Sequence, residues 1–297
     1  MAIGGLREAT VQMLPGASTM LDWLHKRISA NARSEPTVKA GNEPVVLAGH
    51  SHTIAISRHP NGGPAPELIK IDRFDRLYAL VGPWPRDEQY WDELERLAKT
   101  SSIALQWGGS EHSKHLFQSN PPFDFVPRNL TNLPVEETFA IIPDEVIRAD
   151  FESMIGQLDR LLAGLRSVCR YNVFVLGSPP PKPDESFLRA RLEKEPFFIG
   201  LLEQIGFTVE NVKFTRPMIR LKLWHTLQEL FAEAAARHGA HFLPVPASVK
   251  DAIGFLAPQH WAGDVTHADF QFGDIMANKL LCALSTATEA EHGDASI

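Results

Sequence analysis

The sequence predicts an α/β fold in which helices cover a parallel sheet. Two patterns predict it: short apolar runs that end at a glycine, and amphipathic helical patterns between those runs. The runs and their glycines are residues 45–48 before Gly49, 77–81 before Gly82, and 103–107 before Gly108. This alternation is typical of parallel strands joined by crossover helices.

The remaining elements follow the same alternation. Asp87 and Glu88 open a helix between the second and third runs, with apolar residues at helical spacing up to Ala98. Further helices are predicted over residues 146–165, 187–202 and 219–237, with strands at 172–176 and 242–243. A last helix buries Phe272, Ile275, Met276, Leu280 and Leu284, and the chain frays from Thr286 onward. The helical spacing of the apolar residues is that of amphipathic helices, and the short apolar runs are those of buried strands. Small and acidic residues at a chain end are typical of fraying.

The domain organisation predicted from these patterns is one α/β domain over residues 41–297. It follows a helical N-terminal extension over residues 1–40, in which Met20, Leu21, Leu24 and Ile28 share a face. Residues 113–143 are aromatic, rich in proline and asparagine, and without periodicity. We expect this long loop to cover a substrate pocket.

Composition narrows the class of partner. The 297 residues are 44% apolar and 22% charged, with a net charge of −7, as in an ordinary globular protein. A basic patch for nucleic acid is not expected, and no segment is apolar enough to span a membrane. The net charge favours a neutral or weakly charged small-molecule substrate. The only two cysteines, Cys169 and Cys282, and the absence of a secretory signal from the N-terminal residues predict a cytoplasmic protein.

Ser51 is the candidate nucleophile, because it follows the first apolar run and its glycine in the stretch Gly49-His50-Ser51-His52-Thr53. A serine hydroxyl needs a base to take its proton, and the base needs a carboxylate to hold its other nitrogen. Asp264 and His267 lie three residues apart near the C-terminus and provide both groups. Together they predict a Ser-His-Asp triad.

The order of four blocks resembles that of the SGNH/GDSL hydrolases. Residues 49–53 resemble the G-D-S-x-S/T nucleophile block, and residues 264–267 resemble the D-x-x-H block. Gly82 stands where the second-block glycine stands, and residues 108–111 where the G-x-N-D block stands. The resemblance covers residues 45 to 284.

This resemblance implies a flavodoxin-like three-layer α/β/α sandwich and hydrolysis of a small or carbohydrate-linked acyl ester, with no cofactor. Some relatives are acyltransferases. It makes Ser51 the nucleophile, His267 the base and Asp264 its orienting partner. The oxyanion hole would consist of the N–H groups of Ser51 and Gly82 and a side chain from the third block.

The sequence departs from the family pattern at two positions. His50 replaces an aspartate, and Ser110 replaces the asparagine whose amide faces the oxyanion. A serine hydroxyl is shorter than an amide and must rotate to donate. Ser110 stands at the position of the third donor and is expected to fill that role. His112, two residues further on, is the alternative donor if the Ser110 hydroxyl does not reach the oxyanion. The residues expected to line the substrate pocket are those near the blocks: His50, His52, Gly109 and His112.

Two other functions are compatible with the sequence. Gly49-His50-Ser51-His52 also resembles the G-H-x-H of metallophosphoesterases, and His112 and His115 extend a histidine cluster that suggests a metal. The remaining ligand blocks of that family are missing from residues 1–48, so we expect no metal. A binding protein that has lost its chemistry is the second alternative, favoured by the missing asparagine.

Overall fold

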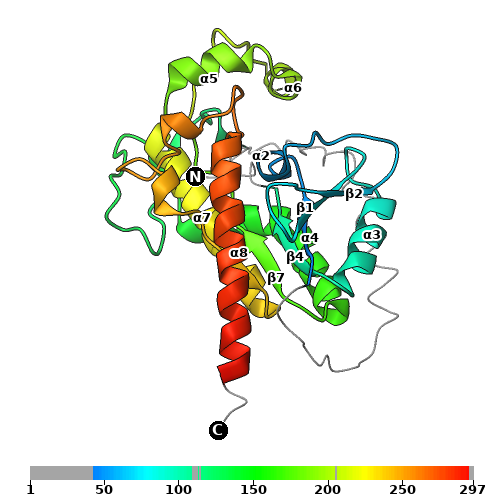
Figure 1. Cartoon of the computed structure of the whole chain (residues 1–297). Helices are drawn as coiled ribbons and strands as arrows, with labels where there is room; N and C mark the ends of the chain where they lie inside the picture. Colours follow the sequence, from blue (N-terminus) through cyan, green and yellow to red (C-terminus); the bar gives the residue numbers. More distant parts are fainter. Residues whose placement is uncertain (1–42, 109–112, 114, 205, 294–297) are drawn as a thin grey trace.

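A six-stranded sheet forms the centre of the computed structural model, which describes residues 43–108, 113, 115–204 and 206–293 (Figure 1). The strand order is β2 (Glu67–Lys70), β3 (Leu77–Val81), β1 (Val45–Gly49), β4 (Ser102–Gln106), β7 (Val173–Leu176) and β8 (His241–Leu243). All neighbours pair in parallel except β2, which runs antiparallel to β3. Without that edge strand the order in chain numbering is 2-1-3-4-5, as in flavodoxin-like folds.

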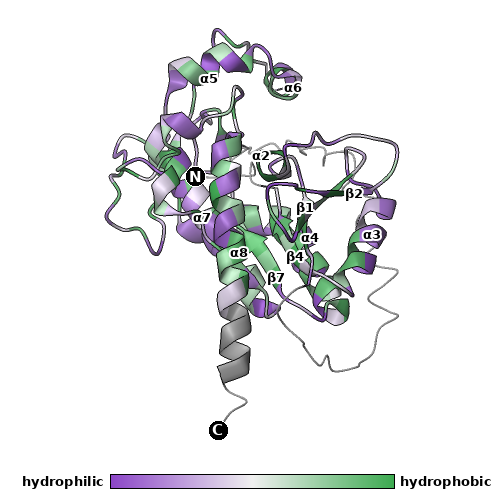
Figure 2. Cartoon of the chain, in the orientation of Figure 1, coloured by the Kyte–Doolittle hydropathy of each residue, from purple (hydrophilic) through white to green (hydrophobic). Residues whose placement is uncertain are grey.

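Helices cover both faces of the sheet, and alternate side chains of one strand point to opposite layers. Val46 and Ala48 of β1 pack with α3 (Glu88–Ala98), α4 (Asp144–Val168) and α7 (Pro217–Arg237). Val45 and Leu47 pack with α2 (Thr53–Ser57) and α8 (Phe270–Gly293). Figure 2 shows the strands as the apolar centre and polar residues on the outer side of α3. The predicted three-layer fold is confirmed.

A third apolar cluster lies beyond the sheet, where α5 (Glu185–Leu192) and α6 (Pro196–Gln204) form a cap at the top of Figure 1. Leu188 and Leu192 of α5 and Phe198 of α6 pack there with Phe117 and with Val265. Val265 belongs to the segment between Asp264 and His267. The cap therefore contacts the segment that holds the predicted base.

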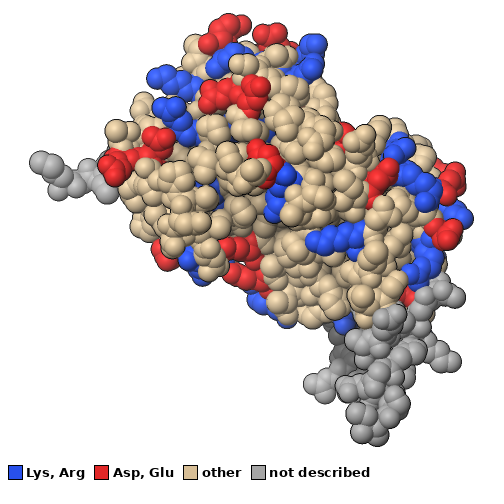
Figure 3. Space-filling model, turned by 60° about the vertical axis from the view of Figure 1, so that its left-hand side comes forward, with Lys and Arg blue, Asp and Glu red and all other residues tan. Residues whose placement is uncertain are grey.

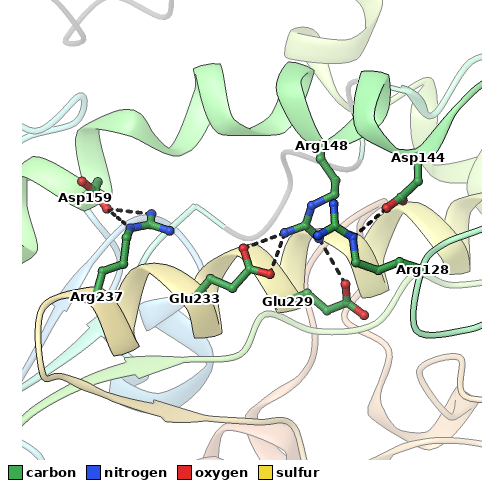
Figure 4. A network of polar contacts seen from close by, with 7 residues as sticks. All are labelled: Arg128, Asp144, Arg148, Asp159, Glu229, Glu233 and Arg237. Atoms are coloured by element: carbon green, nitrogen blue, oxygen red, sulfur yellow. Dashed lines mark hydrogen bonds and ion pairs between the residues drawn. The ribbon is translucent and has the colours of Figure 1, made fainter.

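Ion pairs join α4 to α7 on the outside of one helical layer (Figure 4). The buried guanidinium of Arg148 contacts Glu229 at 3.2 Å and Glu233 at 2.6 Å, and Arg237 contacts Asp159 at 2.7 Å. On the face drawn in Figure 3, basic and acidic side chains are interspersed. That face carries no extended basic surface among its described residues.

Three predicted elements differ from the structure. The helix predicted over residues 187–202 is two helices, because Pro196 lacks the N–H that would continue α5 and begins α6 instead. The last helix continues to Gly293, past the predicted fraying at Thr286. The loop over residues 113–143 contains a short parallel pair, β5 (Phe123–Asp124) and β6 (Ala140–Ile141).

The loop is fixed to the domain by a buried ion pair. Lys222 Nζ lies 2.8 Å and 2.9 Å from the two carboxylate oxygens of Asp124, and both side chains are buried.

The predicted helix over residues 1–40 lies outside the described residues. None of the described helices is both long and apolar enough to cross a membrane.

Candidate active site

Ser51 lies in the turn between β1 and α2, at the carboxyl edge of the sheet. The turn requires glycine at position 49. Gly49 has φ of +131°, and a Cβ there would lie 2.2 Å from the carbonyl oxygen of Gln106 on β4. The next N–H, that of His50, donates to the same carbonyl at 3.1 Å. The turn that carries Ser51 is thus built directly against the neighbouring strand.

Thr53 fixes the peptide unit that joins His50 to Ser51. The carbonyl oxygen of His50 accepts hydrogen bonds from the backbone N–H of Thr53 at 3.0 Å and from its hydroxyl at 2.8 Å. In a trans peptide the N–H points opposite to the carbonyl. The N–H of Ser51 is therefore directed away from α2.

The structure brings Asp264 and His267 to Ser51. Asp264 Oδ2 lies 3.0 Å from His267 Nδ1, and His267 Nε2 lies 2.9 Å from Ser51 Oγ. The other carboxylate oxygen, Oδ1, accepts the backbone N–H groups of Thr266 at 3.0 Å and His267 at 2.7 Å. The segment is closed by the N–H of Ala262, which donates to the carbonyl of His267 at 3.2 Å.

This arrangement determines the tautomer of the imidazole. Burial raises the pKa of Asp264, but the hydrogen bonds and charge of His267, with the charge of Lys182, outweigh burial and hold that pKa well below its ordinary range. An ionised carboxylate only accepts, so Nδ1 of His267 carries a proton and donates it. In the neutral ring, Nε2 then presents its lone pair to the Ser51 hydroxyl. The arrangement is chemically able to remove the serine proton.

Gly82 follows β3, and Arg86 connects it to the turn that carries Ser51. Arg86 is buried, and its Nε donates to the carbonyl of Gly49 at 2.8 Å while Nη1 donates to that of Gly82 at 2.8 Å. A Cβ at Gly82 would lie 3.1 Å from the ring of Tyr90, so the position has little room. Burial lowers the pKa of Arg86, although Tyr90 and Asp87 oppose it.

His50 faces a cluster of tryptophans rather than Ser51. Its Nδ1 accepts the N–H of Gly108 at 2.9 Å, and its ring centroid lies 5.7 Å from that of Trp84 and 4.6 Å from that of Trp107. Burial, together with the charge of Arg86, lowers the pKa of His50 to about 4. The ring is therefore neutral near pH 7, and its proton is on Nε2.

Of the other candidate residues, the structure describes His52 and His115. His52 is buried, with its ring centroid 4.6 Å from that of His267. Gly109, Ser110 and His112 lie outside the described residues. His115 Nε2 contacts Asp150 at 3.0 Å. Within the described ranges, no three histidine, cysteine, aspartate or glutamate side chains are arranged to hold a metal ion.

Sequence reasoning missed three residues around this site. Arg86 is the first. Lys182 and Glu195 are the others: Lys182 Nζ donates to the carbonyl of Asp264 at 2.5 Å, and the Glu195 carboxylate accepts the N–H of Val265. No motif surrounds these three residues, since Lys182 follows three prolines and Glu195 precedes one. A charged side chain that binds backbone groups, as each of these three does, leaves no periodic signal in a sequence.

Comparison with known proteins gives structural likenesses alone. No protein-family model matches the chain, and no curated protein matches it. A catalytic mutant of an acetylxylan esterase from Geobacillus stearothermophilus is 11% identical with a TM-score of 0.45, over 84% of this chain and 96% of that one.

Two further solved structures give similar values. A GDSL-like lipase from Bacteroides thetaiotaomicron is 12% identical with a TM-score of 0.42, over 89% of this chain and 98% of that one. An alpha/beta hydrolase from the metagenome of Lake Arreo, Spain, is 12% identical with a TM-score of 0.41, over 83% and 97%. Scores this low assign neither an activity nor a substrate to this chain.

Proposed function

We propose that the protein is a serine hydrolase of carboxylic esters, in which Ser51 is the nucleophile, His267 the general base and Asp264 the residue that orients it. One observation carries the proposal: two consecutive hydrogen bonds, 3.0 Å and 2.9 Å long, link Asp264 through His267 to Ser51 Oγ. A serine at the carboxyl edge of a parallel sheet is also accessible to a ligand, since ligands bind at this edge in such folds. The four-block order of the sequence supports the same assignment.

The reaction proceeds in two displacements. Ser51 Oγ attacks the ester carbonyl while its proton passes to His267 Nε2, and the tetrahedral intermediate collapses as that proton goes to the leaving alcohol. Water then attacks the acyl-enzyme with His267 again as base, which releases the acid and restores Ser51. Asp264 stays ionised throughout and stabilises the imidazolium.

The oxyanion hole we propose uses the N–H groups of Ser51 and Gly82, with the Ser110 hydroxyl as the side-chain donor. Support comes from the anchoring of the two turns: Thr53 holds the peptide unit that contains the Ser51 N–H, and Arg86 ties the turn at Gly82 to that at Gly49 through their carbonyls. Donors that are fixed before the reaction need no reorganisation when charge develops. Ser110, and a pocket that includes His50, His52, Gly109 and His112, rest on the sequence alone.

The substrate we propose is a small or carbohydrate-linked acyl ester. This substrate class comes from the four-block resemblance.

A cytoplasmic location stays a prediction, based on the use of only two cysteines. Both are free in the structure, Cys169 buried and Cys282 exposed.

The test combines labelling with hydrolysis of p-nitrophenyl acetate. We expect a fluorophosphonate to label Ser51, and Ser51→Ala to lower kcat by roughly a thousandfold or more at an unchanged melting temperature. Ser57→Ala is the matched control. Ser57 is buried at the end of the same short helix, but its hydroxyl bonds the backbone of His59.

The two serines separate the possible results. Label on any other serine, or hydrolysis by Ser51→Ala at the parental rate, would remove Ser51 from the reaction. Loss of activity in Ser57→Ala as large as in Ser51→Ala would mean that damage to α2, and not loss of the nucleophile, explains the result.

A further inference from the structure

A buried lysine lies behind the acid–base pair. The side chain of Lys182 is 1% exposed, and its Nζ donates to the carbonyls of Ala262 at 3.0 Å and Asp264 at 2.5 Å. The same nitrogen lies 3.8 Å from Asp264 Oδ1. Lys182 thus binds the backbone of the segment that presents His267 and adds a positive charge next to its carboxylate.

Lys182 is itself held from several sides. Arg220, a buried residue of α7, donates through Nη1 to the carbonyl of Lys182 at 2.8 Å and through Nη2 to that of Pro183 at 3.2 Å. The ammonium lies 5.1 Å from the ring centroid of Phe187 on α5. A lysine that is fixed at both its backbone and its charged end can hold the groups it binds in place, whereas a mobile surface lysine cannot.

We propose that Lys182 is a positioning residue of the reaction: it fixes the Asp264 carboxylate behind His267 and tunes how readily the imidazole accepts a proton. The inference rests on the proposed function and extends it to a residue that never touches the substrate. An ionised Asp264 stabilises the protonated imidazole, and the cation at Lys182 offsets part of that stabilisation.

The charged groups around Lys182 act in both directions. Burial lowers the pKa of Lys182 to about 8, Asp264 and Glu195 oppose that shift, and Arg191 adds to it. Lys182 is therefore largely charged near neutral pH and loses its charge as the pH rises through about 8. Glu195 also interacts with Asp264 and His267, so removal of the lysine leaves two carboxylates facing the imidazole.

The test compares Lys182→Met with Lys222→Met. Lys222 is the matched control, because it is also buried and ion-paired but contacts Asp124 on the loop. We expect Lys182→Met to lower kcat about tenfold to a hundredfold with little change in KM, as for residues that orient a reacting group. The acid limb of its pH–rate profile should move about half a pH unit or more toward higher pH. Lys222→Met should lower the melting temperature and leave that limb in place.

A second readout does not depend on turnover. The ¹³Cε1 resonances of the histidines are followed by NMR against pH, with His267→Gln to assign the His267 signal. We expect the His267 midpoint to rise in Lys182→Met and to stay at the parental value in Lys222→Met. If Lys182→Met does not fold, Lys182→Gln is measured instead, because its amide retains donors to the carbonyls while the charge is removed.

The two proposals fail separately. A parental His267 midpoint in the folded Lys182 variant overturns the role of Lys182, even where Ser51 is labelled and esters are hydrolysed. If Ser51 is not labelled but the midpoint still rises, the hydrolase assignment fails and the coupling of Lys182 to His267 remains.

Discussion

Asp264 has more partners than the imidazole of His267. Its Oδ1 accepts two backbone N–H groups and its Oδ2 faces His267, while its own carbonyl accepts from Lys182. Each bond to the ionised form favours that form, so the carboxylate remains charged over the whole range in which a histidine titrates. The residue is thus a fixed negative charge, and in the proposed reaction the proton moves between Ser51 and His267 while Asp264 stays ionised.

Substitution of His267 should lower kcat more than substitution of Asp264. His267→Ala should lower kcat by roughly a thousandfold or more, and Asp264→Ala by less, because an imidazole without its orienting partner still accepts some protons. Activity of the parent should fall on acidification as the imidazole is protonated. Both are measured by hydrolysis of p-nitrophenyl acetate from pH 5 to 9.

His115→Ala is the control for this pair. His115 also contacts a carboxylate at 3.0 Å, that of Asp150, but packs against Phe123 and Phe151. We expect it to retain activity. Full activity of His267→Ala at neutral pH would contradict the assignment of the base.

At the residue scale, the sequence pattern selected Ser51, Asp264 and His267, which the structure brings into hydrogen-bond contact. Their catalytic roles stay a prediction. Arg86 and Lys182 escaped sequence reasoning, because any buried cation that reaches carbonyl oxygens could serve from many positions in the chain. His50 shows a third case: the sequence placed it in the pocket, and only the structure shows its Nδ1 bound to Gly108.

Two helices set the distance between the serine and the histidine. α2 begins two residues after Ser51, and α8 begins three residues after His267. They meet at Gly273, where a Cβ would lie 1.8 Å from the carbonyl oxygen of Ala55. A backbone contact this close leaves no room for a side chain, so the helices would have to separate.

Gly273→Ala should therefore damage both stability and activity. Overpacking of this kind typically costs about 1–3 kcal/mol, and separation of α8 from α2 lengthens the contact between His267 and Ser51. Gly164→Ala is the matched control, since Gly164 lies within α4 and a Cβ there meets nothing within 4 Å. It should stabilise by roughly 0.5–1 kcal/mol.

Urea unfolding and ester hydrolysis of both variants check this prediction. Equal stability and equal rates for Gly273→Ala and Gly164→Ala would contradict a role for the α2–α8 contact in the site.

At the element scale, prediction succeeded where a local signal marks a boundary. Asp87 accepts the N–H of Tyr90 and caps α3 where the sequence placed its start. Prediction was wrong where apolar spacing continued through a break, as at Pro196 between α5 and α6. The β5–β6 pair has only two residues in each strand, and the two strands lie apart within a long loop, so no local pattern reveals it.

The stability of the whole molecule should fall in mild acid. Burial, with the charges of Arg86 and Lys250 respectively, lowers the pKa values of His50 and His225 from 6.5 to about 4. Between these values the unfolded chain binds protons that the folded protein does not. The free energy of unfolding therefore decreases as the pH falls from 6.5 toward 4, by at most about 1.4 kcal/mol per pH unit for each histidine.

Urea unfolding at pH 7, 6 and 5 measures this slope. His225→Gln should remove one of the two contributions, and the difference from the parent cancels the other titrating groups. Equal slopes for the parent and the variant would contradict the burial argument for His225.

The bond between Ser51 and His267 joins positions 216 residues apart. The serine lies in the turn after β1, and the histidine precedes α8, the last helix. Contacts between distant positions cost the most loop entropy and are slow to form. On dilution from denaturant, helical signal would thus return before hydrolysis does. If the proposed triad carries the activity, hydrolysis would report that folding is complete, because a partly assembled chain holds the same side chains without their contacts.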